Sequence, residues 1–502
     1  MKKFAIMQIR FNTDNGSMMR HLIRLAGTVI CLYTSTALAS TYSFEQAQSK
    51  LLTSSKSLQS SALLSQASQL QADAVQGLHR PNVSLNVRAL SYHQTADVST
   101  QPLINTLNQQ ISGSIDEQIQ QLNAQGLDPA LSELMGSSAQ SLLSRANDRL
   151  PNELHLDAKD TTVKPSIAVT LPIYTGGAIS SLQEIAQLNA KRHLLSEQER
   201  QQLEKLNLIG KYFGTQLSQS LQSTTGYQFQ AMQLHVDNAY KLEQAGFISR
   251  GQRMQFEVAR NQADRLHQSA ALTHQQNIFE FRTLLQDPTI SQLTTPLFIN
   301  TNEQPNYDAL LEKLTSNSPI TQKLRTDVRI AQNQVTLQEA SKKPKVFALG
   351  EVALDDQDWF VGVAANYTLY SGMDRSAQIK ASRLQADAAN LAALQATQDM
   401  TSSLHRAYLD IQNTQNTHRL LTDNRIAALE NLRIQRLSFQ EGFGTVADVV
   451  DAETRVHQIQ NDIATNAYHY IMALATVLHH TGELDRFGEY LNRADTTMIV
   501  TE

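Results

Sequence analysis

Long stretches without glycine or proline predict unusually long helices in this chain. Residues 374–441 contain neither residue, and as one helix they would extend roughly 100 Å at about 1.5 Å per residue. Residues 445–481 and 252–287 are further uninterrupted stretches, and apolar residues recur in them in alternating three- and four-residue steps, as in a coiled coil. We therefore expect two antiparallel helical hairpins. Their apolar seams comprise Val449, Ala452, Val456, Ile459, Ile463, Tyr470 and Leu474, and Phe256, Ala259, Ala263, Leu266 and Ala270.

Alternating apolar and polar positions predict four strands, two before each hairpin. In residues 83–89 and 167–173 one face is apolar, whereas the other carries small or polar side chains. Residues 346–354 and 359–369 repeat the pattern. Each strand has roughly the nine to eleven residues that cross a bilayer when tilted. The alternative is an ordinary soluble sheet packed on helices, but helices this long extend far beyond so small a sheet.

The chain is a tandem duplication of this plan. Tyr174-Thr175-Gly176 recurs as Tyr370-Ser371-Gly372, and Gly246-Phe247 recurs as Gly442-Phe443, both at an offset of 196 residues. Farther upstream the offset is 263, as for Phe44 and Tyr307, so the first repeat carries an extra segment, which we place at 96–162. The predicted organisation is a signal peptide at 1–39, repeats at 40–300 and 301–485 with hairpin tips near residues 246 and 442, and a C-terminal tail at 486–502.

Four strands cannot close a β-barrel by themselves. About eight strands are the smallest number that encloses a filled interior, and an open edge in lipid would leave backbone donors without partners. Several copies of the chain must therefore share one barrel, with the helices forming a tube below it. The number of copies does not follow from these lengths.

Residues 1–39 have the features of an export signal. Arg20 and Arg24 precede a short apolar run at residues 25–32, and Ala37-Leu38-Ala39 offers the small-x-small pattern that signal peptidase recognises. The run is too short to span a bilayer. Met18 and Met19 stand directly before Arg20 and leave the true start codon open, and the alternative to a signal is a buried N-terminal helix.

Composition and charge exclude several function classes. The 502 residues have a formal net charge of −5, which argues against a nucleic-acid partner because no concentrated basic face is available. The single cysteine, Cys31, lies within the predicted signal, so we expect neither a disulfide nor a thiolate metal site. The 14 histidines are scattered, and no metalloprotease, serine-hydrolase or phosphate-loop motif occurs. We therefore predict no enzyme activity, no catalytic residues and no metal or other cofactor.

Two segments carry a family resemblance. Leu171-Pro172-Ile173-Tyr174-Thr175-Gly176-Gly177 opens one long helix, and the run from Glu441-Gly442-Phe443-Gly444 through Thr445, Asp448, Val449, Asp451 and Ala452 to Thr454 opens the last one. With the signal and the duplication, these segments resemble the TolC-type outer-membrane efflux proteins of Gram-negative bacteria. The resemblance implies an α+β, mainly α fold in which three chains contribute four strands each to one outer-membrane β-barrel, continued by a periplasmic α-helical barrel.

The same resemblance implies a function and its partners. The homotrimer would be the passive exit duct of a tripartite efflux or type I secretion system, embedded in outer-membrane lipid. A periplasmic adaptor (membrane fusion) protein and an inner-membrane pump would deliver the substrate. Drug efflux, type I protein secretion and metal export all use this plan, so the sequence leaves the substrate open. A structural coiled-coil or adhesin-like cell-envelope protein is the alternative, although a coiled coil explains neither the paired strands nor the signal.

Site residues follow from the resemblance, one position at a time. Asp448 and Asp451 match the aspartates that ring the closed periplasmic aperture, where symmetry would make an acidic constriction that attracts cations. The alternative is a solvated helix face, because aspartate is favoured near a helix N-terminus. A second set of residues matches the family's adaptor-docking tips and comprises Gly246, Phe247, Ile248, Gly442 and Phe443. The alternative for this set is plain turn chemistry, since glycine alone satisfies such a turn.

Two departures from the family pattern qualify this assignment. Gly444 and Gln252 stand where the family has a basic and an acidic residue, so the ionic latch of the aperture is expected to be absent, or rebuilt with Arg250 or Arg253. The insert at 96–162 is expected to be extracellular, to contain short amphipathic helices and to decorate the pore mouth. Its alternative is a mobile surface loop without a role.

Overall fold

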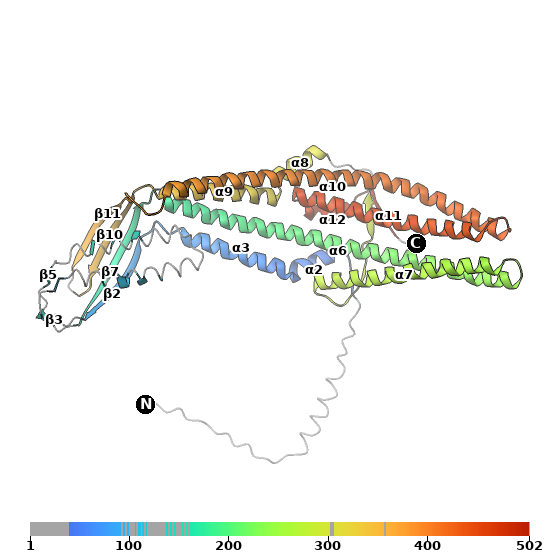
Figure 1. The fold of residues 1–502 in the computed structure, drawn as a ribbon, viewed down its shortest axis with the longest axis horizontal. Helices are drawn as coiled ribbons and strands as arrows, with labels where there is room; N and C mark the ends of the chain where they lie inside the picture. The colour runs from blue at the N-terminus through green and yellow to red at the C-terminus, as the bar shows by residue number, and fades with distance from the viewer. Residues whose placement is uncertain are drawn as a thin grey trace, which may run out of the picture.

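The computed structural model is elongated, with a small sheet at one end and two long helical hairpins that run from it to the other end (Figure 1). The predicted signal at 1–39 and most of the insert at 96–162 lie outside the described residues. Those described are 40–91, 94–95, 98–99, 106, 109–111, 113–114, 117, 137–138, 141–142, 145–146, 153–154, 157–158, 161–301, 306–355 and 358–500.

Each repeat consists of a pair of short helices, two strands and a long helical hairpin, so the predicted duplication and the α+β, mainly α fold class are confirmed. The first repeat contains α2 (Phe44–Ser54), α3 (Lys56–Val75), β2 (Asn82–Ser91), β7 (Thr161–Tyr174), α6 (Ala178–Gln244) and α7 (Arg250–Leu285). The second repeat contains α8 (Tyr307–Ser316), α9 (Pro319–Ala340), β10 (Lys345–Ala353), β11 (Trp359–Asn366), α10 (Arg375–Gln440) and α11 (Val446–Thr481).

The long helices begin and end close to the predicted positions because the sequence caps them. The Asp374 side chain accepts hydrogen bonds from the backbone N–H groups of Ser376 and Ala377 and so starts the 66-residue helix α10. Gly482, with φ of +74°, ends α11 in the left-handed conformation that glycine adopts readily. All seven seam residues predicted in α11 are buried, which confirms the coiled-coil pattern there.

Two helices shorter than the long one pack end to end along it in each repeat. In the first repeat α3 and then α7 pack against α6, and in the second α9 and then α11 pack against α10. The two hairpins also contact each other, since α6 packs against both α9 and α11. None of the helices in the described part of the chain combines the length and apolar character needed to cross a membrane.

A four-stranded sheet in the order β11-β10-β7-β2 joins the two repeats through the antiparallel pair β7 and β10. β2 and β11 are its open edges. The last strand is shorter than predicted: β11 ends at Asn366, opposite the first residue of β10, Lys345. Tyr367 and Leu369, which we predicted on this strand, therefore lie beyond it because no residue of β10 remains to pair with them.

The described pieces of the insert extend in two directions. Two short ladders, β3 (Gln94–Thr95) with β6 (Asp157–Ala158) and β4 (Val98–Ser99) with β5 (Glu153–Leu154), come next along the chain after β2 and before β7. Leu142, in contrast, packs against a buried cluster at the junction of sheet and helices, and Arg145 donates a hydrogen bond to the Val363 carbonyl at 3.4 Å. Part of the insert therefore lies against the sheet itself rather than beyond its far end.

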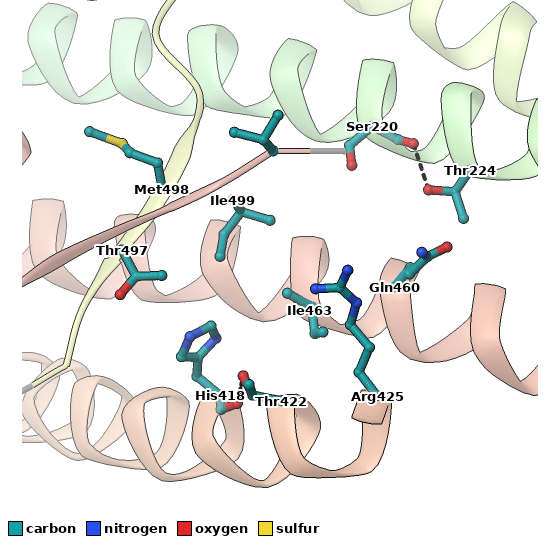
Figure 2. A pocket seen from close by; sticks show the side chains of 11 residues that line it. Ser220, Thr224, His418, Thr422, Arg425, Gln460, Ile463, Thr497, Met498 and Ile499 are labelled. Carbon is teal, nitrogen blue, oxygen red and sulfur yellow. Dashed lines mark hydrogen bonds between the residues drawn. The ribbon is translucent and has the colours of Figure 1, made fainter. Parts of the chain in front are cut away.

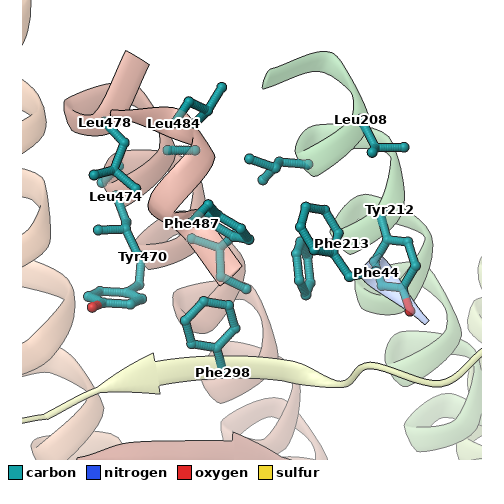
Figure 3. Packing of buried hydrophobic residues seen from close by; sticks show 14 of the residues in the cluster. Phe44, Leu208, Tyr212, Phe213, Phe298, Tyr470, Leu474, Leu478, Leu484 and Phe487 are labelled. Carbon is teal, nitrogen blue, oxygen red and sulfur yellow. The ribbon is translucent and has the colours of Figure 1, made fainter. Parts of the chain in front are cut away.

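Short strands and helices gather at the middle of the hairpins, near the junction of α3 with α7 and of α9 with α11, and we call this group the equatorial belt. Aromatic rings from distant parts of the chain pack there, as Figure 3 shows: Phe44 lies 5.1 Å from Phe487 and Phe213 lies 5.8 Å from Phe298, between ring centroids. The residues predicted as a tail form part of this belt as far as Val500. The belt contains β1 (Ser40–Tyr42) paired with β8 (Ile290–Leu293), β9 (Leu297–Asn300) paired with β12 (Thr496–Ile499), and α12 (Phe487–Leu491).

Candidate functional site

One face of the sheet is apolar and exposed across all four strands. Residues that pair across strands point to the same side, so the register places Leu85 beside Ile167, Ile167 beside Val352, and Val352 beside Trp359. Leu85 is 65% exposed although it is fully apolar. The exposed apolar residues of this face are Val83, Leu85, Val87, Val163, Ile167, Val352, Trp359, Val361 and Val363. An exposed apolar surface of this extent requires a partner or a lipid environment.

The opposite face of the sheet is largely polar on β2 and β7. Asn86 and Arg88 alternate with the apolar residues of β2, and the Arg88 guanidinium lies 3.4 Å from the Glu351 carboxylate of β10. The predicted alternation between an apolar and a polar side is therefore confirmed for β2 and β7. It is wrong for β10 and β11, where the opposite face carries the buried apolar residues Phe347, Leu349 and Ala364, which pack against the helices.

The two hairpin tips have the same turn. Gly246 and Gly442 adopt φ of +79° and +80°, and the N–H of each following phenylalanine donates to a carbonyl five residues earlier, Leu242 or Ser438, at 2.9 Å. This is the Schellman turn, in which the residue after glycine usually makes an apolar contact with the helix. Phe247 is nevertheless 79% exposed and Phe443 90% exposed. The turn explains the glycines and leaves the exposed rings unexplained.

Ile248 has a different role from the two phenylalanines. It is half-buried and packs against a small cluster of Ala239, Phe256 and Val446, which joins the first hairpin to the start of α11. Ile248 therefore contributes to the core of the tip, while Phe247 and Phe443 project from it.

Asp448 and Asp451 are both exposed near the start of α11, but only Asp448 forms hydrogen bonds that cap the helix. Its carboxylate accepts hydrogen bonds from the Thr445 backbone N–H at 2.9 Å and hydroxyl at 2.6 Å, while the Thr445 hydroxyl accepts from the Asp448 N–H. This capping box starts the helix. The hydrogen bonds from Thr445 hold the pKa of Asp448 below its usual range. Asp451 makes no hydrogen bond or ion pair with any described residue.

The two positions that depart from the family pattern have local structural reasons. A Cβ atom at Gly444 would lie 2.9 Å from the Phe439 backbone nitrogen, so a side chain there would require the turn to move. Gln252 completes the capping box of α7, where its side chain accepts a hydrogen bond from the Ser249 N–H at 2.8 Å. Arg253 pairs with Glu243 at 2.5 Å and also with Glu257, both in the first hairpin. Arg253 therefore does not connect the two hairpins.

A buried carboxylate that we did not single out from the sequence makes that connection. Glu453, only 4% exposed, lies within reach of His235 in α6, Arg436 in α10 and His457 in α11. No local signal in the sequence marks it, because the position after the seam residue Ala452 flanks the seam, where glutamate is common and usually exposed.

A cavity of about 200 Å³ with a mixed polar and apolar lining lies under the C-terminal strand, where α6, α10, α11 and β12 meet (Figure 2). Its polar lining includes His418, Arg425 and Gln460. Burial lowers the pKa of His418, so its imidazole is neutral at pH 7. In the part of the chain that the structure describes, no three His, Cys, Asp or Glu side chains are grouped so that they could hold a metal ion.

Comparisons with known proteins agree with this architecture. Residues 310–483 match the family model described as outer membrane efflux protein, whereas a sequence search of curated proteins found no match. The outer membrane protein VceC from Vibrio cholerae aligns over 88% of this chain and 96% of its own, with a TM-score of 0.68 and 13% identity. The outer membrane channel CmeC from Campylobacter jejuni aligns over 88% and 86%, with a TM-score of 0.66 and 9% identity.

The outer membrane channel MtrE from Neisseria gonorrhoeae aligns over 88% of this chain and 89% of its own, with a TM-score of 0.66 and 13% identity. At these identities the structural matches establish a shared fold. The resemblance to outer-membrane efflux proteins is confirmed by the family match over most of the second repeat and by the fold over most of the chain.

Proposed function

We propose that this chain is the outer-membrane duct of a tripartite efflux or type I secretion system, through which substrates delivered by an inner-membrane pump leave the cell. The observation that carries this proposal is the sheet at one end of two very long hairpins. Its exposed apolar face fits the hydrocarbon of a bilayer, and its two open edges fit strand pairing with further copies of the chain.

The assembly that follows is a homotrimer with one shared β-barrel in the outer membrane and an α-helical barrel in the periplasm. Three copies would supply twelve strands, four from each chain. The tips would then meet a periplasmic adaptor, and the part of the insert that carries the ladders of β3 with β6 and β4 with β5 would lie at the outer surface. The match of residues 310–483 to the efflux family supports this assignment.

Crosslinking of the detergent-solubilised protein should give one defined oligomer, a trimer, because a single sheet cannot close a barrel. Before solubilisation the protein should fractionate with outer membranes, and the solubilised protein should show heat-modifiable mobility and conduct ions in a planar bilayer. A soluble, non-conducting product would instead support the structural coiled-coil or adhesin-like alternative, and a monomer that conducts would contradict the shared barrel.

Asp448 and Asp451 are proposed to form an acidic ring at the periplasmic aperture. In a trimer each position occurs three times, and like charges crowded at a narrow pore attract cations. The variant to test is Asp448→Asn/Asp451→Asn, because asparagine keeps the oxygen that accepts from Thr445 in the capping box. Cation selectivity should fall, and block by hexammine cobalt from the periplasmic side should weaken roughly tenfold.

The matched control is Asp264→Asn in α7. That substitution removes one aspartate charge per chain, where the tip variant removes two, and it keeps an acceptor for Gln268, but it lies on the first hairpin away from the tip. Selectivity and block should stay at the parent level in this control. Equal reversal potentials in the parent and the tip variant would mean that Asp448 and Asp451 face away from the pore.

A further inference from the structure

The cavity under the C-terminal strand is bounded by both repeats of the chain. Its lining comes from α6 of the first hairpin, from α10 and α11 of the second hairpin, and from β12 of the equatorial belt (Figure 2). Its volume is about 200 Å³. Since benzene occupies a protein cavity of about 150 Å³, this cavity suits a molecule slightly larger than benzene.

The polar lining of the cavity carries one positive charge and no negative charge. The Arg425 guanidinium extends from α10 toward the cavity, near the Gln460 side chain of α11 (Figure 2). Ser220 and Thr224 of α6 add hydroxyl groups, and none of the eleven lining residues is acidic. Arginine binds a carboxylate through two parallel N–H···O hydrogen bonds, so this composition favours an anionic ligand.

His418 offers the same ligand a second hydrogen-bond donor. It lies about two turns before Arg425 on α10, and its imidazole points from that helix toward β12 (Figure 2). The side chain is 8% exposed, and its Nδ1 atom has no hydrogen-bond partner among the described residues. Such buried polar atoms are rare, because burial without a partner costs free energy. An imidazole that carries its proton on Nδ1 can donate it to a carboxylate oxygen in the cavity.

The remaining wall of the cavity is apolar. Ile463 of α11 belongs to a buried apolar cluster, and Ile499 of β12 packs against that cluster. Met498 and Val500, which are 41% and 70% exposed, also line the cavity from β12 and the residue after it. An inorganic anion would leave this wall without contacts, so the lining fits a ligand that has an apolar body as well as a charge.

We propose that the cavity binds a small organic anion, a monocarboxylate with an apolar ring or short chain. Its carboxylate pairs with Arg425 and His418, and its apolar part lies against Ile463 and Ile499. The bound molecule contacts both hairpins and β12 at once, so it stabilises the attachment of the C-terminal strand. The site needs only the folded chain, and it stands or falls independently of the proposed channel function.

Benzoate is a suitable probe, because it joins one carboxylate to a single ring. Isothermal titration calorimetry of the purified protein in a neutral detergent should detect one saturable benzoate site per chain. Benzoate should also raise the unfolding temperature, since a ligand that binds only the folded state stabilises it. Benzyl alcohol has the same ring without the charge and should bind at least about tenfold more weakly.

Two variants locate the site, and a third serves as the control. Arg425→Gln should weaken benzoate binding at least about tenfold. Thr224→Met keeps Arg425 and His418 but fills part of the cavity from α6, so it should abolish binding. Arg419→Gln is the matched control, because Arg419 is an exposed arginine of the same helix that does not line the cavity. This control should bind benzoate with the parental affinity.

The results that would overturn the proposal are specific. Absence of saturable benzoate binding to the parent protein would exclude the site, and this measurement needs no variant to fold. Equal affinities of Arg425→Gln and Arg419→Gln would place the bound benzoate outside the cavity. Equal affinities for benzoate and benzyl alcohol would contradict an anionic ligand.

Discussion

Replacing Leu85 by arginine should prevent insertion of the protein into the outer membrane. Leu85 lies near the middle of β2 on the apolar face of the sheet and is 65% exposed in the single chain. On the lipid face of a barrel an arginine near the bilayer midplane costs about 2 to 4 kcal/mol, and a trimer would bear that cost three times. The measurement is the fraction of protein that is heat-modifiable in purified outer membranes, which should fall below detection.

The neighbouring residue supplies the control. Asn86 lies on the other face of the same strand, so Asn86→Arg introduces the same side chain one position away but directs it toward the polar side. This variant should insert at close to the parental level. Equal insertion of both variants would mean that the apolar face does not contact lipid, and the barrel proposal would fail with it.

Changing both Phe247 and Phe443 to aspartate should abolish export while leaving membrane insertion normal. Each ring projects from a Schellman turn that does not need it, and exposed aromatic rings of this kind are typical anchors of a protein interface. A charge placed in a desolvated contact costs about 1 to 3 kcal/mol or more, and three copies of each tip would multiply the effect. Export of a reporter substrate and crosslinking to the adaptor should fall together.

A conservative variant distinguishes docking from turn stability. Phe247→Leu/Phe443→Leu keeps an apolar side chain at both tips and leaves the glycine turns untouched, so export should be reduced only modestly. Unimpaired export in the aspartate variant would assign the tips to turn chemistry alone. Loss of outer-membrane insertion in that variant would instead indicate a folding defect.

The long helices and the sheet could be predicted because their signals are local. A helix of 66 residues is evident from the absence of glycine and proline together with the cap at Asp374, and a strand is evident from its alternation. Helix α6 contains Gly210, Gly214 and Gly226, so it could be predicted only from the duplication. Asp448 was harder to interpret: its sequence position indicated an exposed aspartate, but its capping box with Thr445 became evident only from the hydrogen bonds.

Contacts between distant residues could not be predicted in this way. The partners of Glu453 come from α6, α10 and α11, and nothing in the sequence near Glu453 identifies His235. The belt strands β9 and β12 have four residues each, too few for a periodic pattern, and their pairing joins Asn300 to Thr496. The three-dimensional fold sets both features, and no short segment encodes either of them.

The aromatic rings of the equatorial belt impose an order on folding. Phe44, near the start of the described chain, packs against Phe487, near its end, so this contact forms only after the intervening helices are in place. Closing so large a loop has a high entropic cost and makes such contacts late events in folding. Until then, Phe213 and Phe298 remain without Phe487 as a partner. This aromatic surface therefore stays exposed until the last residues of the chain arrive, and a partly folded chain is prone to aggregate during that interval.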